Sequence, residues 1–171
     1  KMQYVCNPAG ILSQAACDTI DTMLHALEQQ TGIETVVAIV PSIGDMECFD
    51  FCHQLLNQWG VGKKGKDNGL VILLVTDQRC IQFYTGYGLE GVLPDAICKR
   101  IQTKYMIPYL KDGNWNEGMV AGIRATCQRL DGSMENESLS ESNNESMDFI
   151  FAVILFAVIG VGIAFFAARN Q

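Results

Sequence analysis

The side chains best suited to chemistry are carboxylates within one short stretch of the chain: Asp67, Asp77, Glu90 and Asp95. Asp67 lies just before an apolar run that is typical of a central strand, and Asp77 lies just after it. A strand of about eight residues would hold the two more than about 20 Å apart, because each residue adds about 3.3 Å. They therefore cannot bind one ion together unless the loop before the strand folds back.

A second strand, at residues 80–85, follows closely enough to form an antiparallel hairpin with the first. Its far end lies beside the start of the first strand. We therefore expect Glu90 and Asp95 to converge there with Asp67, and Asn68 to lie beside them. Carboxylate and amide oxygens are hard ligands, which suit Ca²⁺ or Mg²⁺.

Simpler roles remain open for these side chains. Asp95 follows Pro94 at the start of an expected helix, where a carboxylate stabilises the N-terminus. Asp67 could cap a turn. Asp77 and Arg79 are secondary candidates, because hairpin geometry places them in a separate turn where they could form an ion pair.

Lys63 and Lys64 precede the carboxylates in a glycine-rich loop that formally matches GxGxxG. A dinucleotide site needs a strand before that motif and a helix after it, and here the order is reversed. The lysines are therefore candidates for phosphate contact, with a solvated basic loop as the alternative. Both histidines are expected on helix surfaces, so nucleophile–base catalysis has little support, and acid–base chemistry would need metal-bound water.

Hydrophobic periodicity predicts the elements that position these groups. Strands are expected at residues 34–40, 69–76 and 80–85, and helices at 13–30, 46–59, 94–106 and 115–130. The last part of the third helix should break before Pro108. This order predicts an α/β fold, a three-layer α/β/α sandwich in which helices cover both faces of a small mixed sheet.

Seven cysteines are many for a domain of this size, and their odd number leaves at least one unpaired. Cys48 and Cys52 are one helical turn apart with His53 adjacent, so a metal site is possible there. Small buried thiols in the core are the simpler interpretation. In the same helix we expect Phe49 and Trp59 on the buried face and His53 on the solvated face.

The C-terminal part of the chain differs in composition from the domain at residues 1–130. Residues 131–148 carry six acids and no base, which indicates a solvated acidic linker rich in Ser and Asn. Residues 149–168 carry no charge and would span about 30 Å, so they predict a transmembrane helix, with a buried core helix as the alternative. Residues 169–171 form a short tail.

The charges and the first residues of the chain suggest on which side of a membrane the domain lies. The net charge is −7, but residues 1–130 carry 13 acids and 11 bases, so no basic patch argues for nucleic acid. A chain that begins Lys1-Met2 suggests a processed form and a removed signal peptide. Asp148 before the span and Arg169 after it favour a cytoplasmic C-terminus and an extracytoplasmic domain. The abundance of thiols argues against an oxidising exterior.

Several short motifs together resemble those of the TPM-domain family (extracytoplasmic, phosphatase-like domains) over about residues 4–130. The motifs are Asn7-Pro8-x-Gly10-x-Leu12-Ser13, Asp67-Asn68-Gly69, Asp77-x-Arg79, Gly86-Tyr87-Gly88-Leu89-Glu90, Leu93-Pro94-Asp95 and Gly113-Asn114-Trp115. The resemblance implies an α/β/α sandwich that binds a divalent cation, often Ca²⁺, in an acidic cleft near the second and fourth motifs. It also implies an extracytoplasmic or lumenal location, often with one transmembrane helix. One plant member is linked to acid phosphatase activity and one animal member to receptor modulation, so the fold does not decide the function.

Two functions follow as hypotheses. In the first, the chain is a membrane-anchored module that binds Ca²⁺ in preference to Mg²⁺ through Asp67, Asn68, Glu90 and Asp95 and serves a protein partner in or at the membrane. In the second, it is a metal-assisted acid phosphatase in which Lys63 or Lys64 meets the phosphate. The first is favoured because no nucleophile is evident and a cluster of carboxylates repels phosphate unless a metal is present.

Overall fold

The computed structural model describes residues 4–62 and 64–133. The chain divides into two compact units, residues 1–132 and 133–171. The predicted transmembrane helix at residues 149–168 and the short tail lie outside the described residues, as does almost all of the acidic linker. In the part that is described, no helix combines the length and the apolar character that a membrane span requires.

The core of the first unit is a mixed sheet of four strands in the order β1-β2-β3-β4. The strands are β1 (Val5–Cys6), β2 (Glu34–Val40), β3 (Gly69–Val75) and β4 (Cys80–Thr85). The first three are parallel, whereas β4 is antiparallel to β3, with Leu70 opposite Thr85 and Val75 opposite Cys80. The predicted mixed sheet and hairpin are confirmed. The sequence did not predict β1, because two residues show no periodicity.

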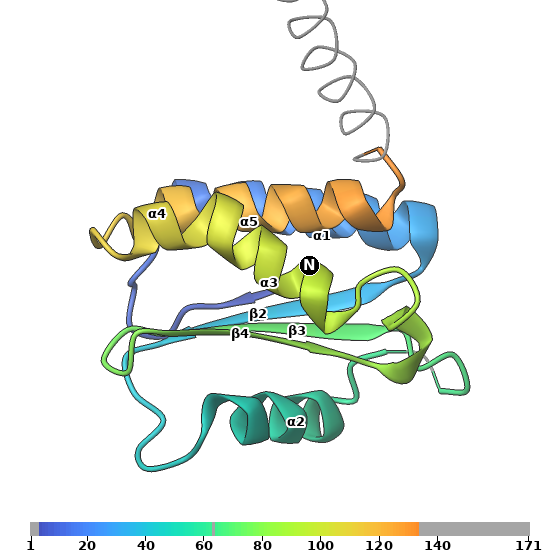
Figure 1. Cartoon of the computed structure of the whole chain (residues 1–171), viewed down its shortest axis with the longest axis horizontal. Coiled ribbons are helices and arrows are strands. Elements are labelled where there is room, and N and C mark those ends of the chain that lie inside the picture. The colour runs from blue at the N-terminus through green and yellow to red at the C-terminus, as the bar shows by residue number, and fades with distance from the viewer. Residues whose placement is uncertain (1–3, 63, 134–171) are drawn as a thin grey trace, which may run out of the picture. The chain divides into compact units, whose positions relative to one another are not determined.

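Helices cover both faces of the sheet (Figure 1). One face carries α1 (Gln14–Thr31), α3 (Asp95–Ile101), α4 (Ile107–Leu110) and α5 (Trp115–Leu130), and the other carries α2 (Cys48–Trp59). All seven residues of β3 are buried, because β3 lies inside the sheet with helices on both sides. The α/β fold predicted from the sequence is therefore confirmed.

The ends of α1 show how local chemistry sets an element. The hydroxyl of Ser13 accepts a hydrogen bond from the backbone N–H of Ala16 at 3.2 Å, which satisfies a donor at the helix start. At the other end, Gly32 adopts a left-handed φ of 72° and its N–H donates to the carbonyl of Glu28 at 2.8 Å. Both residues are of types that favour helix ends, and the predicted helix is confirmed.

The prediction for the buried face of α2 was wrong in part. Phe49 is 55% exposed and Trp59 is 47% exposed, whereas Cys52 and Leu55 are buried against the sheet. The seam that faces the sheet runs through Cys52 and Leu55. Phe49 lies about a quarter-turn from that seam, and Trp59 is the last residue of the helix.

The predicted break before Pro108 takes a different form. After α3 the chain continues through a π-helical segment, Gln102–Met106, and then through α4, which has Pro108 in its first turn. Proline is tolerated there because the π-helical segment has already shifted the hydrogen bonds from α-helical spacing: the N–H of Ile107 donates to the carbonyl of Gln102, five residues back. The change in hydrogen bonding falls at the predicted place, but the chain stays helical.

Candidate functional site

The start of β3 and the end of β4 bring two loops together. The N–H of Gly86 donates to the carbonyl of Gly69 at 2.8 Å, and the N–H of Gly88 donates to the carbonyl of Asp67 at 3.0 Å. A short 3₁₀ helix, Tyr87–Leu89, then carries the chain to Glu90. The turn after β4 is thereby fastened to the loop before β3 by backbone hydrogen bonds.

Glycine is required in this turn because the two backbones touch. A Cβ atom on Gly86 would overlap the carbonyl oxygen of Asp67, and one on Gly88 would overlap the carbonyl oxygen of Lys66. Asp67 itself has a φ of 49°, in the left-handed region that Asp and Asn tolerate better than other side chains. The two glycines of the Gly-Tyr-Gly motif therefore allow the two loops to approach closely.

Beside this junction lies a pocket of about 310 Å³ that Asp67 and Glu90 both line. Its other polar lining residues come from α2, from the 60–68 loop, from the end of β4 and from the 3₁₀ helix after it; they are His53, Asn57, Lys64, Tyr84, Thr85 and Tyr87. The pocket thus unites two of the predicted metal ligands with one of the predicted phosphate contacts. We call it the Asp67–Glu90 pocket.

The other predicted ligands lie elsewhere. The Asn68 amide donates to the carbonyl of Gly32 at 2.7 Å, so this side chain ties the loop to the end of α1. Asp95 is the first residue of α3 and does not line the pocket. Lys63 lies outside the described residues.

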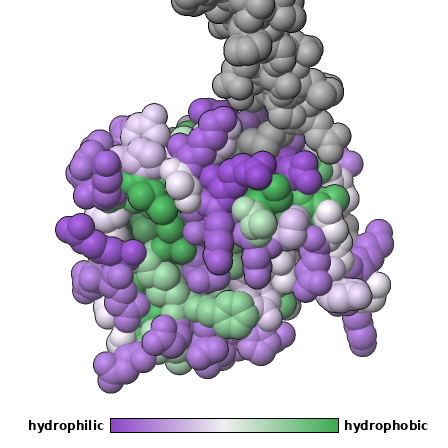
Figure 2. Space-filling model, viewed as in Figure 1, coloured by the Kyte–Doolittle hydropathy of each residue, from purple (hydrophilic) through white to green (hydrophobic). Residues whose placement is uncertain are grey.

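Asp77 and Arg79 lie at the opposite end of β3, exposed on the turn that leads into β4. Apolar side chains gather at this end, below α4 (Figure 2). A pocket of about 220 Å³ lies there, lined mainly by apolar residues, among them Ile81, Ile107 and Leu110. The structure therefore separates Asp77 and Arg79 from the Asp67–Glu90 pocket.

The sequence predicts His53 on a solvated helix face and gives no sign that Tyr84 lies beside it. In the structure the ring of His53 stacks on that of Tyr84, with centroids 5.4 Å apart and planes 29° apart. Phe49 also packs on Tyr84, with centroids 5.1 Å apart. The spacing of His53 and Asn57, one helical turn apart, was the available signal, but only the packing of α2 beside β4 shows which surface they face.

The chemistry available in the Asp67–Glu90 pocket comes mainly from oxygen atoms. Two carboxylates, the Asn57 amide and the Thr85 hydroxyl are the donor types that hard divalent cations prefer. Across residues 4–62 and 64–133, no three His, Cys, Asp or Glu side chains lie close enough to form a metal site by themselves. Backbone carbonyls, water or a partner's oxygens would have to complete the coordination shell.

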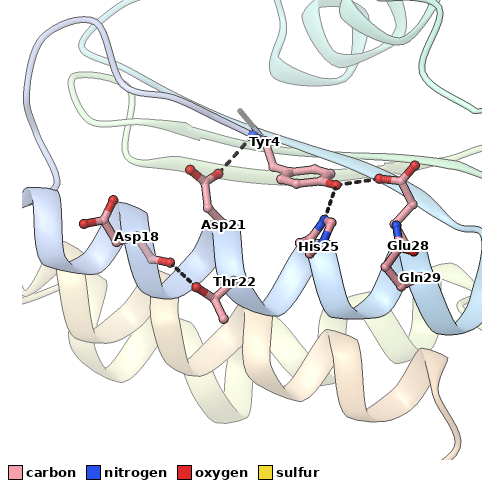
Figure 3. A pocket seen from close by; sticks show the side chains of 7 residues that line it. All are labelled: Tyr4, Asp18, Asp21, Thr22, His25, Glu28 and Gln29. Carbon is pink, nitrogen blue, oxygen red and sulfur yellow. Dashed lines mark hydrogen bonds between the residues drawn. The ribbon is translucent and has the colours of Figure 1, made fainter. Parts of the chain in front are cut away.

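A second pocket, of about 480 Å³, lies between α1 and Tyr4, the residue before β1 (Figure 3). The Tyr4 hydroxyl donates to Glu28 at 2.6 Å and lies 3.2 Å from Nδ1 of His25, while the Tyr4 N–H donates to Asp21 at 2.9 Å. Burial, and then the hydrogen bond to Glu28, raise the pKa of Tyr4 to about 12. These bonds hold the N-terminal strand against α1.

The cysteines fall into two classes. Cys48 and Cys80 form a disulfide that joins the start of α2 to the start of β4, with Cα atoms 6.8 Å apart. The prediction that Cys48 is a core thiol was therefore wrong, whereas Cys52 is a fully buried free thiol. Burial raises the pKa of Cys52 to about 12 and the pKa values of Cys98 and Cys127 to about 11.

Comparison with known proteins agrees with this architecture. The family described as the TPM domain matches residues 5–129. The N-terminal domain of a protein from P. gingivalis is 44% identical, with a TM-score of 0.72 over 78% of this chain and 85% of that one. No match was found among curated proteins.

Two further solution structures share the fold at low identity. The N-terminal domain of the cg2496 protein from Corynebacterium glutamicum is 15% identical, with a TM-score of 0.60 over 74% of this chain and 79% of that one. The BA42 protein from the psychrophilic bacterium Bizionia argentinensis is 18% identical, with a TM-score of 0.62 over 72% of this chain and 84% of that one. At these identities the likeness concerns the fold alone.

Proposed function

The chain belongs to the TPM domain family, and from this premise we propose that it is a module that binds a divalent cation and acts as an accessory to membrane proteins. The observation that carries the proposal is that Asp67 and Glu90, which lie on opposite sides of the hairpin in the sequence, line one pocket. Two carboxylates in a shared pocket repel one another, and a cation relieves that repulsion.

Ca²⁺ fits the pocket better than Mg²⁺. The oxygen donors come from two loops and from α2, so their arrangement is irregular. Ca²⁺ accepts irregular shells of 6–8 oxygens, whereas Mg²⁺ demands a near-ideal octahedron. The Lys64 ammonium lowers the affinity for any cation, which is consistent with a weak site that a partner's oxygens would strengthen.

We propose further that the domain lies outside the cytoplasm and is anchored through residues 149–168. The Cys48–Cys80 disulfide supports this location, because disulfides persist in oxidising compartments and are rare in the cytosol. In that setting the pocket would face a protein partner in or at the membrane.

Calorimetric titration of the full chain with Ca²⁺ and with Mg²⁺ tests the proposal. Asp67→Asn and Glu90→Gln should each weaken Ca²⁺ binding at least about tenfold, because each removes one charge next to the ion. Asn tolerates the left-handed φ of Asp67, so the first variant should keep its fold. Asp77→Asn, at the far end of β3, is the matched control and should bind like the wild type. Failure of the wild type to bind either ion would refute the proposal.

A metal-assisted acid phosphatase is the second candidate. Lys64 and His53 line the same pocket as the two carboxylates, so they supply an ammonium that could contact phosphate and an imidazole that could move a proton. Turnover of p-nitrophenyl phosphate that EDTA abolishes, and that falls at least about a hundredfold in His53→Ala, would place this function first. Absence of turnover in the presence of Ca²⁺ and Mg²⁺ would exclude it.

A further inference from the structure

The disulfide joins the two elements that form one wall of the Asp67–Glu90 pocket. Cys48 is the first residue of α2, and Cys80 is the first residue of β4. Further along, α2 contributes His53 to the pocket and β4 contributes Tyr84. One covalent bond therefore fixes the relative position of both contributors.

Apart from this bond, α2 is attached through one apolar seam, in which Phe51 and Leu56 are partly buried beside Cys52 and Leu55. It is the helix that covers its face of the sheet (Figure 1), and of its 12 residues only Cys52 and Leu55 are buried. By contrast, α5 buries seven of its 16 residues. The segments that flank α2, residues 41–47 and 60–66, are mostly exposed where they are described. The disulfide adds a covalent link to this seam at the N-terminal end of α2.

Aromatic rings connect the disulfide to the pocket. Phe49, next to Cys48, packs on Tyr84, and His53 stacks on the same ring. A shift of the N-terminal end of α2 would change both ring contacts. Because His53 and Tyr84 line the pocket, such a shift would change its shape.

The disulfide is also more accessible than most of the free thiols. Cys48 and Cys80 are half-buried, whereas Cys17, Cys52, Cys98 and Cys127 are buried. Cys6 is half-buried and unpaired, but it lies on β1, at the other edge of the sheet. A thiolate attacking from solvent can therefore reach this disulfide, and the core thiols are poorly placed to exchange with it.

We propose that the Cys48–Cys80 disulfide is a redox switch for cation binding at the Asp67–Glu90 pocket, an inference that rests on the proposed function. In the oxidised form α2 is fixed and the pocket binds the cation. A dithiol reductant supplies two electrons and two protons: the S–S bond breaks, Cys48 and Cys80 become thiols, and the reductant closes to its own disulfide. The released end of α2 then moves, and affinity falls.

The test compares oxidised full chain, the same chain reduced with dithiothreitol, and the Cys48→Ser/Cys80→Ser variant. Affinity for Ca²⁺, measured by calorimetry, should fall about fivefold or more on reduction and in the variant. Amide hydrogen exchange should rise in α2 and stay unchanged in α5. Cys6→Ser, which removes a half-buried free thiol, is the matched control and should keep both the affinity and the response to reduction.

Two outcomes would overturn the switch and can be told apart. Equal Ca²⁺ affinity in the oxidised and reduced chains refutes the switch alone, whether or not exchange in α2 changes. No Ca²⁺ binding in either form refutes the proposed function and the switch with it. Reduction of the wild type decides the question if the double variant does not fold.

Discussion

The two ends of β3 are built in different ways. At its start, two loops meet through backbone hydrogen bonds from Gly86 and Gly88, and a polar pocket with two carboxylates lies beside them. At its end, a disulfide fastens the turn to α2, and the neighbouring pocket is mainly apolar. One end is held by backbone hydrogen bonds beside a polar pocket, whereas the other is held covalently beside an apolar one.

This difference indicates where function is expected. A site for a ligand needs polar groups that can adjust, and loops that meet through backbone contacts provide them. A covalent link at the opposite end limits how far the helix above the pocket can move. The conspicuous motifs Asp77-x-Arg79 and Gly86-Tyr87-Gly88 therefore have different roles, although they lie close together in the sequence.

The largest effect is expected at the covalent end. Removal of the disulfide by Cys48→Ser/Cys80→Ser should lower the free energy of unfolding by about 3–4 kcal/mol, because the unfolded chain regains the entropy of a closed loop. Urea denaturation followed by circular dichroism measures it. A loss below about 1 kcal/mol would show that the covalent link adds little to stability, which would contradict the contrast between the two ends.

At the other end, Gly86→Ala should cost about 2–3 kcal/mol, because its Cβ would overlap the backbone carbonyl of Asp67. The same variant should lose Ca²⁺ binding. Gly91→Ala is the matched control: no heavy atom lies within 4 Å of a Cβ built there, so its stability should match the wild type. Equal stability of the two variants would mean that the close approach of Gly86 to the Asp67 carbonyl is not required at the start of β3.

A smaller effect compares one amide side chain at each end. Asn68→Ala should cost about 1–2 kcal/mol, because it leaves the partly buried carbonyl of Gly32 without its 2.7 Å donor. Gln78→Ala removes an equally short bond to the carbonyl of Gly44, but both groups are exposed and water can replace the donor. Its cost should stay below about 0.5 kcal/mol. The opposite order of costs would overturn this comparison.

The smallest effect concerns Cys52 in α2, between the two ends of β3, and it is absent at neutral pH. Burial raises the pKa of Cys52 to about 12, so the folded protein holds this proton more tightly than the unfolded chain does. The resulting stability is complete below pH 9, the ordinary value, and is lost as pH rises from 9 to 12. Thermal melts of wild type and Cys52→Ala across this range should converge as pH rises. Parallel curves would contradict the burial of this thiol.

Much of the scaffold could be predicted from the sequence because its signals are local. The caps of α1, Ser13 and Gly32, act on their own helix, and the apolar run of β3 marks a strand buried on both faces. A pattern of apolar residues cannot predict an element that is too short to show it, and β1 has only two residues. The exposure of Phe49 and Trp59 was also not predicted. Helical periodicity does not show which side of an amphipathic helix meets the sheet, or where the helix ends relative to the sheet.

The hairpin could be predicted from the sequence, and with it the separation of Asp67 from Asp77, because a strand of this length holds its two ends far apart. Which groups share a pocket depends on how the elements pack, and the structure was needed to show it. It joined Glu90 to Asp67 and added His53, while it turned Asn68 toward Gly32 and left Asp95 at a helix start. It also paired Cys48 with Cys80, since side chains distant in sequence become neighbours only when α2 packs on the sheet.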